Sequence, residues 1–249
     1  MSRSRSARLS VWRPTPLERV LRGAQHYPEH VDPSIWDSDA RRMAEAGANV
    51  VRMGEFAWHL WEPYEGHFGF DLFDRAIASL GAHGIDTILC TPTATPPRWL
   101  TRDYPEVLRI DTNGQTAQHG SRQHADTTSP VFRHHSRRIT RALATHYRDN
   151  PHVIGWQTDN ELNNSASESY SPSCHLAFQV WLKQRYDGSV AALNDAWSGH
   201  FWALAYDSFA DIELHAPMRR PFRRQGMCWT TTGFWRPRWR RFSRTKWIS

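Results

Sequence analysis

The chain has 249 residues, of which 39% are hydrophobic and 22% are charged. This composition is typical of a folded protein and argues against a disordered one. The formal net charge is +6, but residues 219–249 carry ten Arg and Lys and no acid, while residues 1–218 carry 21 basic and 25 acidic side chains. The body is therefore slightly acidic, which argues against a uniformly basic, nucleic-acid-binding protein.

Localisation signals are also missing from the sequence pattern. No apolar stretch approaches the roughly 20 residues that a membrane-spanning helix needs. The basic N-terminus lacks the apolar core and the cleavage site of a secretory signal. The three cysteines, at positions 90, 174 and 228, are widely spaced and odd in number, which favours a reducing compartment. We therefore expect a cytoplasmic protein with no membrane partner and no nucleic-acid partner.

Apolar runs alternate with helical patterns along the chain. They predict strands at 20–27, 49–53, 85–91 and 153–158, and helices that begin at 33, 71 and 129 and end near 47, 81 and 148. This alternation indicates βα units and a parallel sheet. The segments after the second and third strands are long, and those before strands are short, as in barrel enzymes with a site at the C-terminal mouth. The pattern predicts about the first half of a (β/α)8 TIM barrel; a flavodoxin-like open sheet is the alternative.

The four residues Thr158-Asp159-Asn160-Glu161 close the fourth predicted strand. An Asn-Glu pair at the mouth of a barrel strand is a typical place for the general acid of a glycosidase. A retaining glycosidase needs a second carboxylate about 5–5.5 Å from the first. Glu161 is therefore the first candidate for a catalytic residue.

Six segments in order resemble glycoside hydrolase family 42, the barrel β-galactosidases, over about residues 18 to 218. They are Gln25–His30, Arg52–Trp58, Thr93–Leu100, Tyr104–Glu106, Gly120–His124 and Gly155–Glu161. The resemblance implies a retaining hydrolase of terminal β-galactosides that needs no cofactor. Its members are often trimers, so it also implies a homo-oligomer.

The resemblance gives roles to four residues. Glu161 would be the acid/base, and Asn160 would hold the sugar 2-hydroxyl. Arg122 would reach into the galactose site, and Trp202, after Phe201, would stack on the pyranose ring. The alternatives are a helix-capping Glu161, an Asn160 that bonds its own backbone, an exposed loop arginine and a core tryptophan. Three further residues near the mouth receive no role: Glu55, Trp58 and His124.

Some family members carry a structural zinc ion bound by four cysteines. Only Cys174 has a counterpart among these positions here, because Asp126, Ser169 and Ser171 occupy the other three. Aspartate can ligate zinc, but serine is a poor ligand. We therefore expect no metal site.

The family's nucleophilic glutamate lies at the seventh barrel strand. Glu168 and Glu213 are the only glutamates after Glu161, and neither closes an apolar strand. We therefore divide the chain into an N-terminal extension at 1–17, the N-terminal half of a glycoside hydrolase barrel at 18–224 and an aberrant Arg/Trp-rich tail at 225–249. We expect such a fragment to be inactive alone.

The tail has neither helical nor strand periodicity. Met227-Cys228-Trp229-Thr230 must be encoded as ATG-TGY-TGG-ACN, and reading one base earlier forces Val-Leu-Asp, which resembles the start of the family's next helix. A frameshift near residues 224–227 is our interpretation. A genuine extension that binds nucleic acid or membrane is the alternative. For the whole chain, the alternatives to a β-galactosidase are a barrel glycosidase acting on arabinosides or xylosides and a non-catalytic, basic-tailed binding protein.

Overall fold

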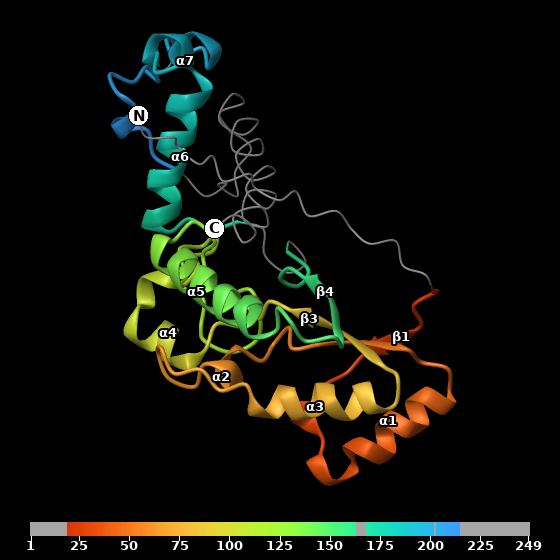
Figure 1. The fold of residues 1–249 in the computed structure, drawn as a ribbon. Helices are drawn as coiled ribbons and strands as arrows, with labels where there is room; N and C mark the ends of the chain where they lie inside the picture. Colours follow the sequence, from red (N-terminus) through yellow and green to blue (C-terminus); the bar gives the residue numbers. More distant parts are fainter. Residues whose placement is uncertain (1–18, 163–167, 202, 215–249) are drawn as a thin grey trace, which may run out of the picture.

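The computed structural model describes residues 19–162, 168–201 and 203–214 (Figure 1). Its sheet contains β1 (Gly23–Gln25), β2 (Val50–Met53), β3 (Asp86–Cys90) and β4 (Val153–Gln157). The strands pair in chain order and every pair is parallel. A doubly wound sheet reverses its strand order at a switch point, and the four described strands do not. Their order is that of a (β/α)8 barrel, so the sheet is part of such a barrel, as predicted.

Three of the helices agree with those that the sequence pattern predicts. The expected helices correspond to α1 (Trp36–Glu45), α3 (Asp71–Ala82) and α5 (Pro130–His146). The predicted long loops contain α2 (Trp58–Trp61) and α4 (Arg98–Asp103), and α6 (Pro172–Arg185) and α7 (Val190–Ala196) follow β4. Short 3₁₀ turns are η1 (Pro28–His30), η2 (Pro33–Ile35), η3 (Pro105–Val107) and η4 (Phe209–Asp211). The predicted extension at 1–17 and the tail at 225–249 lie outside the described residues.

The main core lies between the sheet and its helices. In α3, Phe73, Ile77 and Leu80 are almost fully buried, because their spacing puts them on one face of the helix. They pack in one cluster with Leu89 of β3. The turn from β2 into α2 needs glycine at position 54. Its φ is +90°, and a Cβ there would lie 2.1 Å from the ring of Trp61.

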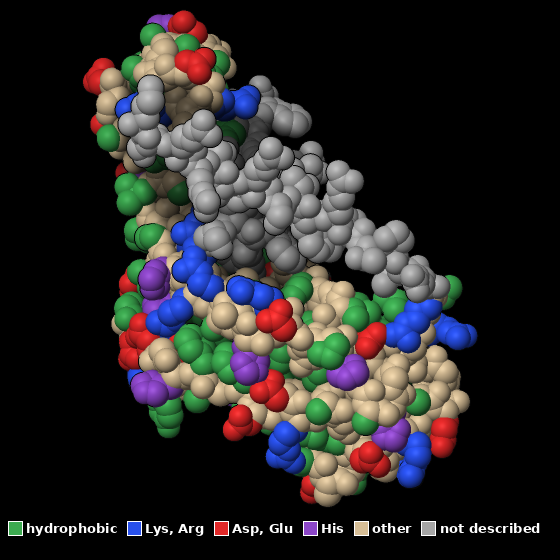
Figure 2. Space-filling model, viewed as in Figure 1, with side chains coloured by type: hydrophobic (Ala, Val, Ile, Leu, Met, Phe, Trp, Pro, Cys, Tyr) green, Lys and Arg blue, Asp and Glu red, His purple; other side chains and the backbone are tan. Residues whose placement is uncertain are grey.

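A second, smaller core forms around α6 and α7, which project away from the sheet (Figure 1). It contains six buried residues: Cys174, Phe178, Leu182, Leu193, Ile212 and Leu214. No helix in the described part of the chain is long and apolar enough to cross a membrane. On the face seen in Figure 2, acidic, basic and histidine side chains are interspersed over the lower part of the molecule. This agrees with the mixed charge of the body.

Glu62 is a fully buried carboxylate that anchors the long segment after β2. It accepts hydrogen bonds from the indole of Trp58 at 2.9 Å and from the backbone N–H of Gly66 at 2.7 Å, and it pairs with Arg138 of α5. A buried charge is tolerated only when it is paired and hydrogen-bonded. Glu62 therefore attaches this segment firmly to α5.

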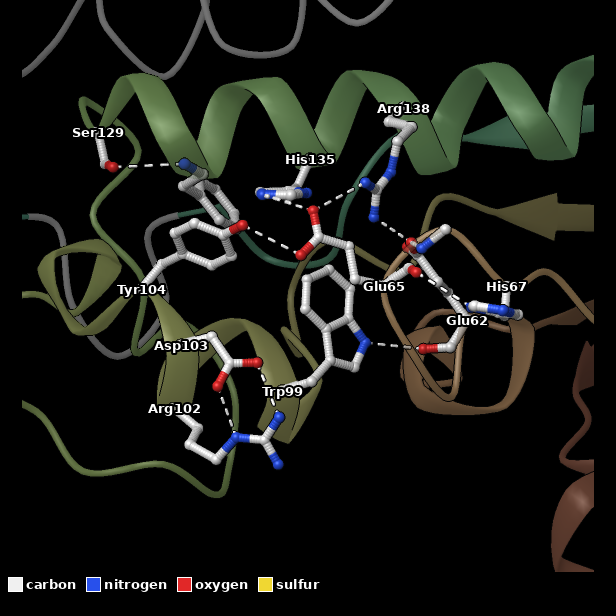
Figure 3. Close-up of polar contacts among 12 residues, drawn as sticks. Glu62, Glu65, His67, Trp99, Arg102, Asp103, Tyr104, Ser129, His135 and Arg138 are labelled. Atoms are coloured by element: carbon white, nitrogen blue, oxygen red, sulfur yellow. Dashed lines mark hydrogen bonds and ion pairs between the residues drawn. The ribbon is translucent and has the colours of Figure 1, made fainter.

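The segment after β3 joins the same network (Figure 3). The Trp99 indole donates to the Glu62 carbonyl at 2.9 Å, and the Tyr104 hydroxyl donates to Glu65 at 3.0 Å. Arg138 lies over the Trp99 ring, 5.6 Å from its centroid. Both long mouth segments are thus held against the outer helix layer.

Replacing Arg138 with alanine tests this attachment. The change leaves the buried Glu62 charge without its cation, so we expect the free energy of unfolding to fall by about 2–4 kcal/mol. Arg137→Ala is the matched control, because Arg137 is an exposed neighbour on α5, and it should stay within about 0.5 kcal/mol of the parent. Urea unfolding measures both; equal effects would show that Arg138 is not an anchor.

His135 gives the fold a dependence on pH. It is 3% exposed, and burial together with nearby Arg138 lowers its pKa to about 4 from an ordinary 6.5. The unfolded chain therefore takes up a proton at higher pH than the folded protein does. The stability that a neutral His135 confers is complete above about pH 6.5 and declines as the pH falls toward 4.

We expect His135→Gln to flatten the unfolding midpoint over this pH range. His200→Gln is the control, because the His200 side chain is 81% exposed. Thermal unfolding at intervals from pH 7 to pH 4 measures the slope. A slope that His135→Gln leaves unchanged would assign the pH dependence to other groups.

Candidate active site

Arg52 links strands that are not neighbours in the sheet. Its Nη1 donates to Oε1 of Gln157 in β4, and its Nη2 donates to Oε1 of Glu55, both at 2.8 Å. Since β3 separates β2 from β4, the two strands lie about 9–10 Å apart at ordinary strand spacing. The side chains must therefore meet across the inner face at the carboxyl ends of the strands, where barrel enzymes have their sites.

The ends of β1 and β2 supply further polar groups. Glu55 is fully buried and also accepts from the Tyr27 hydroxyl at 2.9 Å. Burial and the Glu55 contact raise the pKa of Tyr27, and burial and then Glu55 raise that of Glu29. Burial raises the pKa of the Cys90 thiol to about 12. Cys90 is therefore no thiolate nucleophile.

The loop after β4 is held in an unusual conformation by Asp159. The Asp159 N–H donates to the Thr91 hydroxyl at 2.8 Å, and its carboxylate accepts from the Thr93 hydroxyl and from the Asn160 N–H, both at 2.7 Å. Asp159 and Glu161 have φ values of 60° and 41°. Such values are uncommon for residues other than glycine, and they cluster at functional sites.

The structure brings Arg122, Asn160 and Glu161 together. The Nη1 of Arg122 lies 2.8 Å from Oε2 of Glu161, and about half of the Glu161 side chain is exposed. Asn160 is 7% exposed, and its Oδ1 accepts from the Gln157 amide at 3.5 Å. Gln123 holds the two loops together, because its amide donates to the Asn160 carbonyl at 3.0 Å and to the Glu161 carbonyl.

Two of the simpler alternatives can be compared with these contacts. The next described helix after Glu161 is α6, and Ser171 caps it by accepting from the Cys174 N–H at 3.0 Å. Glu161 is therefore not its cap, and Arg122 is paired rather than an isolated loop arginine. Trp202 lies outside the described residues.

Trp58 and His124, for which the sequence predicts no role, are both buried. Trp58 is fully buried and bonds Glu62, so it belongs to the core. His124 is 5% exposed, and burial and then His119 lower its pKa to about 4. His124 is thus a buried, neutral residue of the loop that carries Arg122, and its ring lies against the His119 ring, with 5.3 Å between the centroids.

Sequence reasoning missed Arg52, Gln157, Asp159 and Gln123 as parts of the site. The available signal was a polar residue inside or just after an apolar strand, as with Arg52 and Gln157. Of the carboxylates that the described residues place at the strand ends, Glu55 and Asp159 are buried and hydrogen-bonded. Glu161 is the one with an exposed carboxyl beside an arginine, so it can exchange a proton with a bound molecule.

The four positions that correspond to the zinc cysteines also meet. Asp126, Ser169, Ser171 and Cys174 are all buried. Ser171 donates to Asp126 and accepts from the Cys174 N–H, and Ser169 accepts from the Ser171 N–H at 3.4 Å. Their oxygens already bond one another and the backbone, and two are serine hydroxyls, which are poor zinc ligands. These residues do not fit a zinc ion.

A parallel sheet in barrel order, with an Asn-Glu pair at the end of its fourth strand, defines a barrel of the glycoside hydrolase type. The profile of the family described as Beta-galactosidase, glycoside hydrolase family 42, matches residues 25–247. The chain belongs to this family. The match extends into the predicted tail, and our interpretation of the tail as aberrant stays a prediction.

Known relatives are similar over most of this chain. A β-galactosidase from Thermus thermophilus is 46% identical over 201 residues, which is 80% of this chain and 31% of the relative. BgaH from Haloferax lucentense is 44% identical over 196 residues, covering 78% and 29%. A solved GH42 β-galactosidase from G. stearothermophilus superposes with a TM-score of 0.86 at 30% identity, covering 94% and 34%. The chain thus spans about a third of the length of these relatives.

Replacing Asp159 with asparagine tests the loop after β4. The amide oxygen can still accept from the Asn160 N–H, but both bonds lose the charge of the carboxylate and Thr93 can no longer donate to it, so we expect a loss of about 1–3 kcal/mol in unfolding free energy. Asp195→Asn is the control, because the Asp195 side chain is 74% exposed. Chemical unfolding measures both variants, and similar small losses would contradict a supporting role for Asp159.

Proposed function

We propose that this chain supplies the acid/base half of the active site of a retaining β-galactosidase. The observation that carries the proposal is the contact of 2.8 Å between Arg122 and Glu161, next to Asn160 at the mouth of the sheet. Family membership and the β-galactosidase relatives support the substrate class.

In the first step, the Glu161 carboxylic acid protonates the glycosidic oxygen as its bond to the sugar carbon breaks. A nucleophilic carboxylate on the opposite face of the sugar forms the covalent bond. In the second step, the Glu161 carboxylate takes a proton from water, and the water oxygen replaces the enzyme at the sugar carbon. Because four strands are half of an eight-stranded barrel, we infer that the nucleophile comes from a later strand.

The neighbours of Glu161 are suited to holding the sugar. The Gln157 contact orients the Asn160 amide so that its nitrogen can donate to the 2-hydroxyl. Arg122 uses one N–H on Glu161, and a guanidinium carries five N–H donors. The others can bind adjacent sugar hydroxyls. Substrate binding therefore places the leaving oxygen near an acid that is already positioned.

A chimera provides the test. Residues 19–214 replace the matching segment of the Thermus thermophilus β-galactosidase, which supplies the other strands. We expect the chimera to hydrolyse nitrophenyl β-galactoside and Glu161→Gln to lower kcat/KM by about 10²–10⁴. On a dinitrophenyl galactoside the loss should be smaller, because that leaving group needs little protonation.

Glu168→Gln is the matched control and should keep the activity of the chimera. An equal loss on both leaving groups would contradict the acid role of Glu161. Faster hydrolysis of arabinoside or xyloside than of galactoside would overturn the substrate class. Proton NMR of the first product distinguishes retention from inversion. We expect the 249-residue chain alone to show no turnover.

A further inference from the structure

A cluster of buried hydrogen bonds joins the segment after β3 to the start of α6. Asp126, at 1% exposure, is its centre. Its Oδ1 accepts from the Thr128 N–H at 2.7 Å, and its Oδ2 accepts from the Thr128 hydroxyl at 2.9 Å and from the Ser171 hydroxyl. Ser171 in turn accepts from the Cys174 N–H at 3.0 Å. One carboxylate thus binds its own loop and the N-cap of a helix from the other core.

The backbone reinforces this junction beside Ser169. The Ser169 hydroxyl accepts from the Ile110 N–H and from the Ser171 N–H, both at 3.4 Å. The Tyr170 N–H donates to the Ile110 carbonyl at 2.9 Å. The segment from 169 to 171 is therefore bonded to the barrel loop on two sides.

A metal ion is not needed to hold this arrangement together. A structural zinc site requires four strong ligands, usually thiolates and imidazoles, and in the described part of the chain no three His, Cys, Asp or Glu side chains form a metal-binding group. Here the donors and acceptors satisfy one another. Three donors satisfy the Asp126 carboxylate, and buried polar groups that are fully hydrogen-bonded rigidify a structure.

We propose that Asp126, Ser169 and Ser171 form a metal-free clasp, which is a set of hydrogen bonds between the loop that carries Arg122 and the start of α6. This clasp fixes the position of Arg122. Asp126 follows Arg122 by four residues, and between them the Gln123 N–H donates to the Ala94 carbonyl at 2.8 Å. The loop that presents Arg122 is thus bonded to the barrel on one side and clasped to α6 on the other. Asp126 and Ser171 are positioning residues, and this inference does not depend on the sugar that is hydrolysed.

The first experiment measures metal dependence in the full 249-residue chain, expressed in zinc-supplemented medium. We expect no stoichiometric zinc by elemental analysis. We also expect the same unfolding midpoint with EDTA and with added zinc chloride. Bound zinc whose removal by EDTA lowers the midpoint would overturn the proposal.

The second experiment separates the clasp from simple helix capping. Ser171→Ala removes both the cap of α6 and the bond to Asp126. Ser189→Ala removes only a cap, because Ser189 accepts from the Ala192 N–H at the start of α7. Thr128→Val is a milder change that removes one donor to Asp126 and leaves α6 capped.

Hydrogen exchange at the amides of residues 122–128 is the readout. We expect Ser171→Ala and Thr128→Val to accelerate exchange there roughly tenfold or more, and Ser189→Ala to leave it unchanged. Acceleration confined to α6 in Ser171→Ala, with no change from Thr128→Val, would show an ordinary helix cap and contradict the clasp.

Discussion

One guanidinium sets the geometry of the sheet's inner face. Arg52 reaches across β3 to Gln157 of β4 and also holds the buried Glu55, so separating the ends of β2 and β4 would break a hydrogen bond of a guanidinium that is already fixed by a buried carboxylate. Parallel pairing already brings these ends to one edge. The Arg52 contacts add a fixed distance between them. The loops that carry Arg122 and Glu161 begin from this edge, and their meeting depends on it.

Three buried carboxylates fix neighbouring segments in the same way at three places in the fold. Glu55 pairs with Arg52 inside the sheet, Glu62 pairs with Arg138 on the helix side, and Asp126 is satisfied by hydroxyl and N–H donors at the junction with α6. Glu62 and Asp126 join segments distant in sequence through these contacts, and Glu55 does so through the Tyr27 hydroxyl. Burying an ion is costly unless its partners are correctly placed, so each also selects one arrangement of its loops. Together they hold the mouth around the exposed carboxyl of Glu161.

The sequence predicts the elements that have an apolar run, a regular spacing of apolar residues or a capping motif. Strands β2 and β3 are mostly apolar, and α5 has an N-cap serine and begins with a proline, so all three were predicted. Helix α6 was not, because Leu176 and Val180 are exposed while Phe178 and Leu182 are buried, which removes the one-sided pattern. Glu161, Asn160 and Arg122 were proposed from motifs, and the structure places Arg122 in contact with Glu161. The partners of Arg52 and Asp126 could not be found, because contacts across many residues leave no local signal.

The clasp also bears on how the two cores are connected. The sheet with α1, α3 and α5 buries one apolar cluster, and α6 with α7 buries another. The bond between Asp126 and Ser171 spans 45 residues and joins the two. The loop with Arg122 therefore has its final shape only while α6 is docked. A change that loosens α6 from the barrel would thus reach Arg122 without touching it.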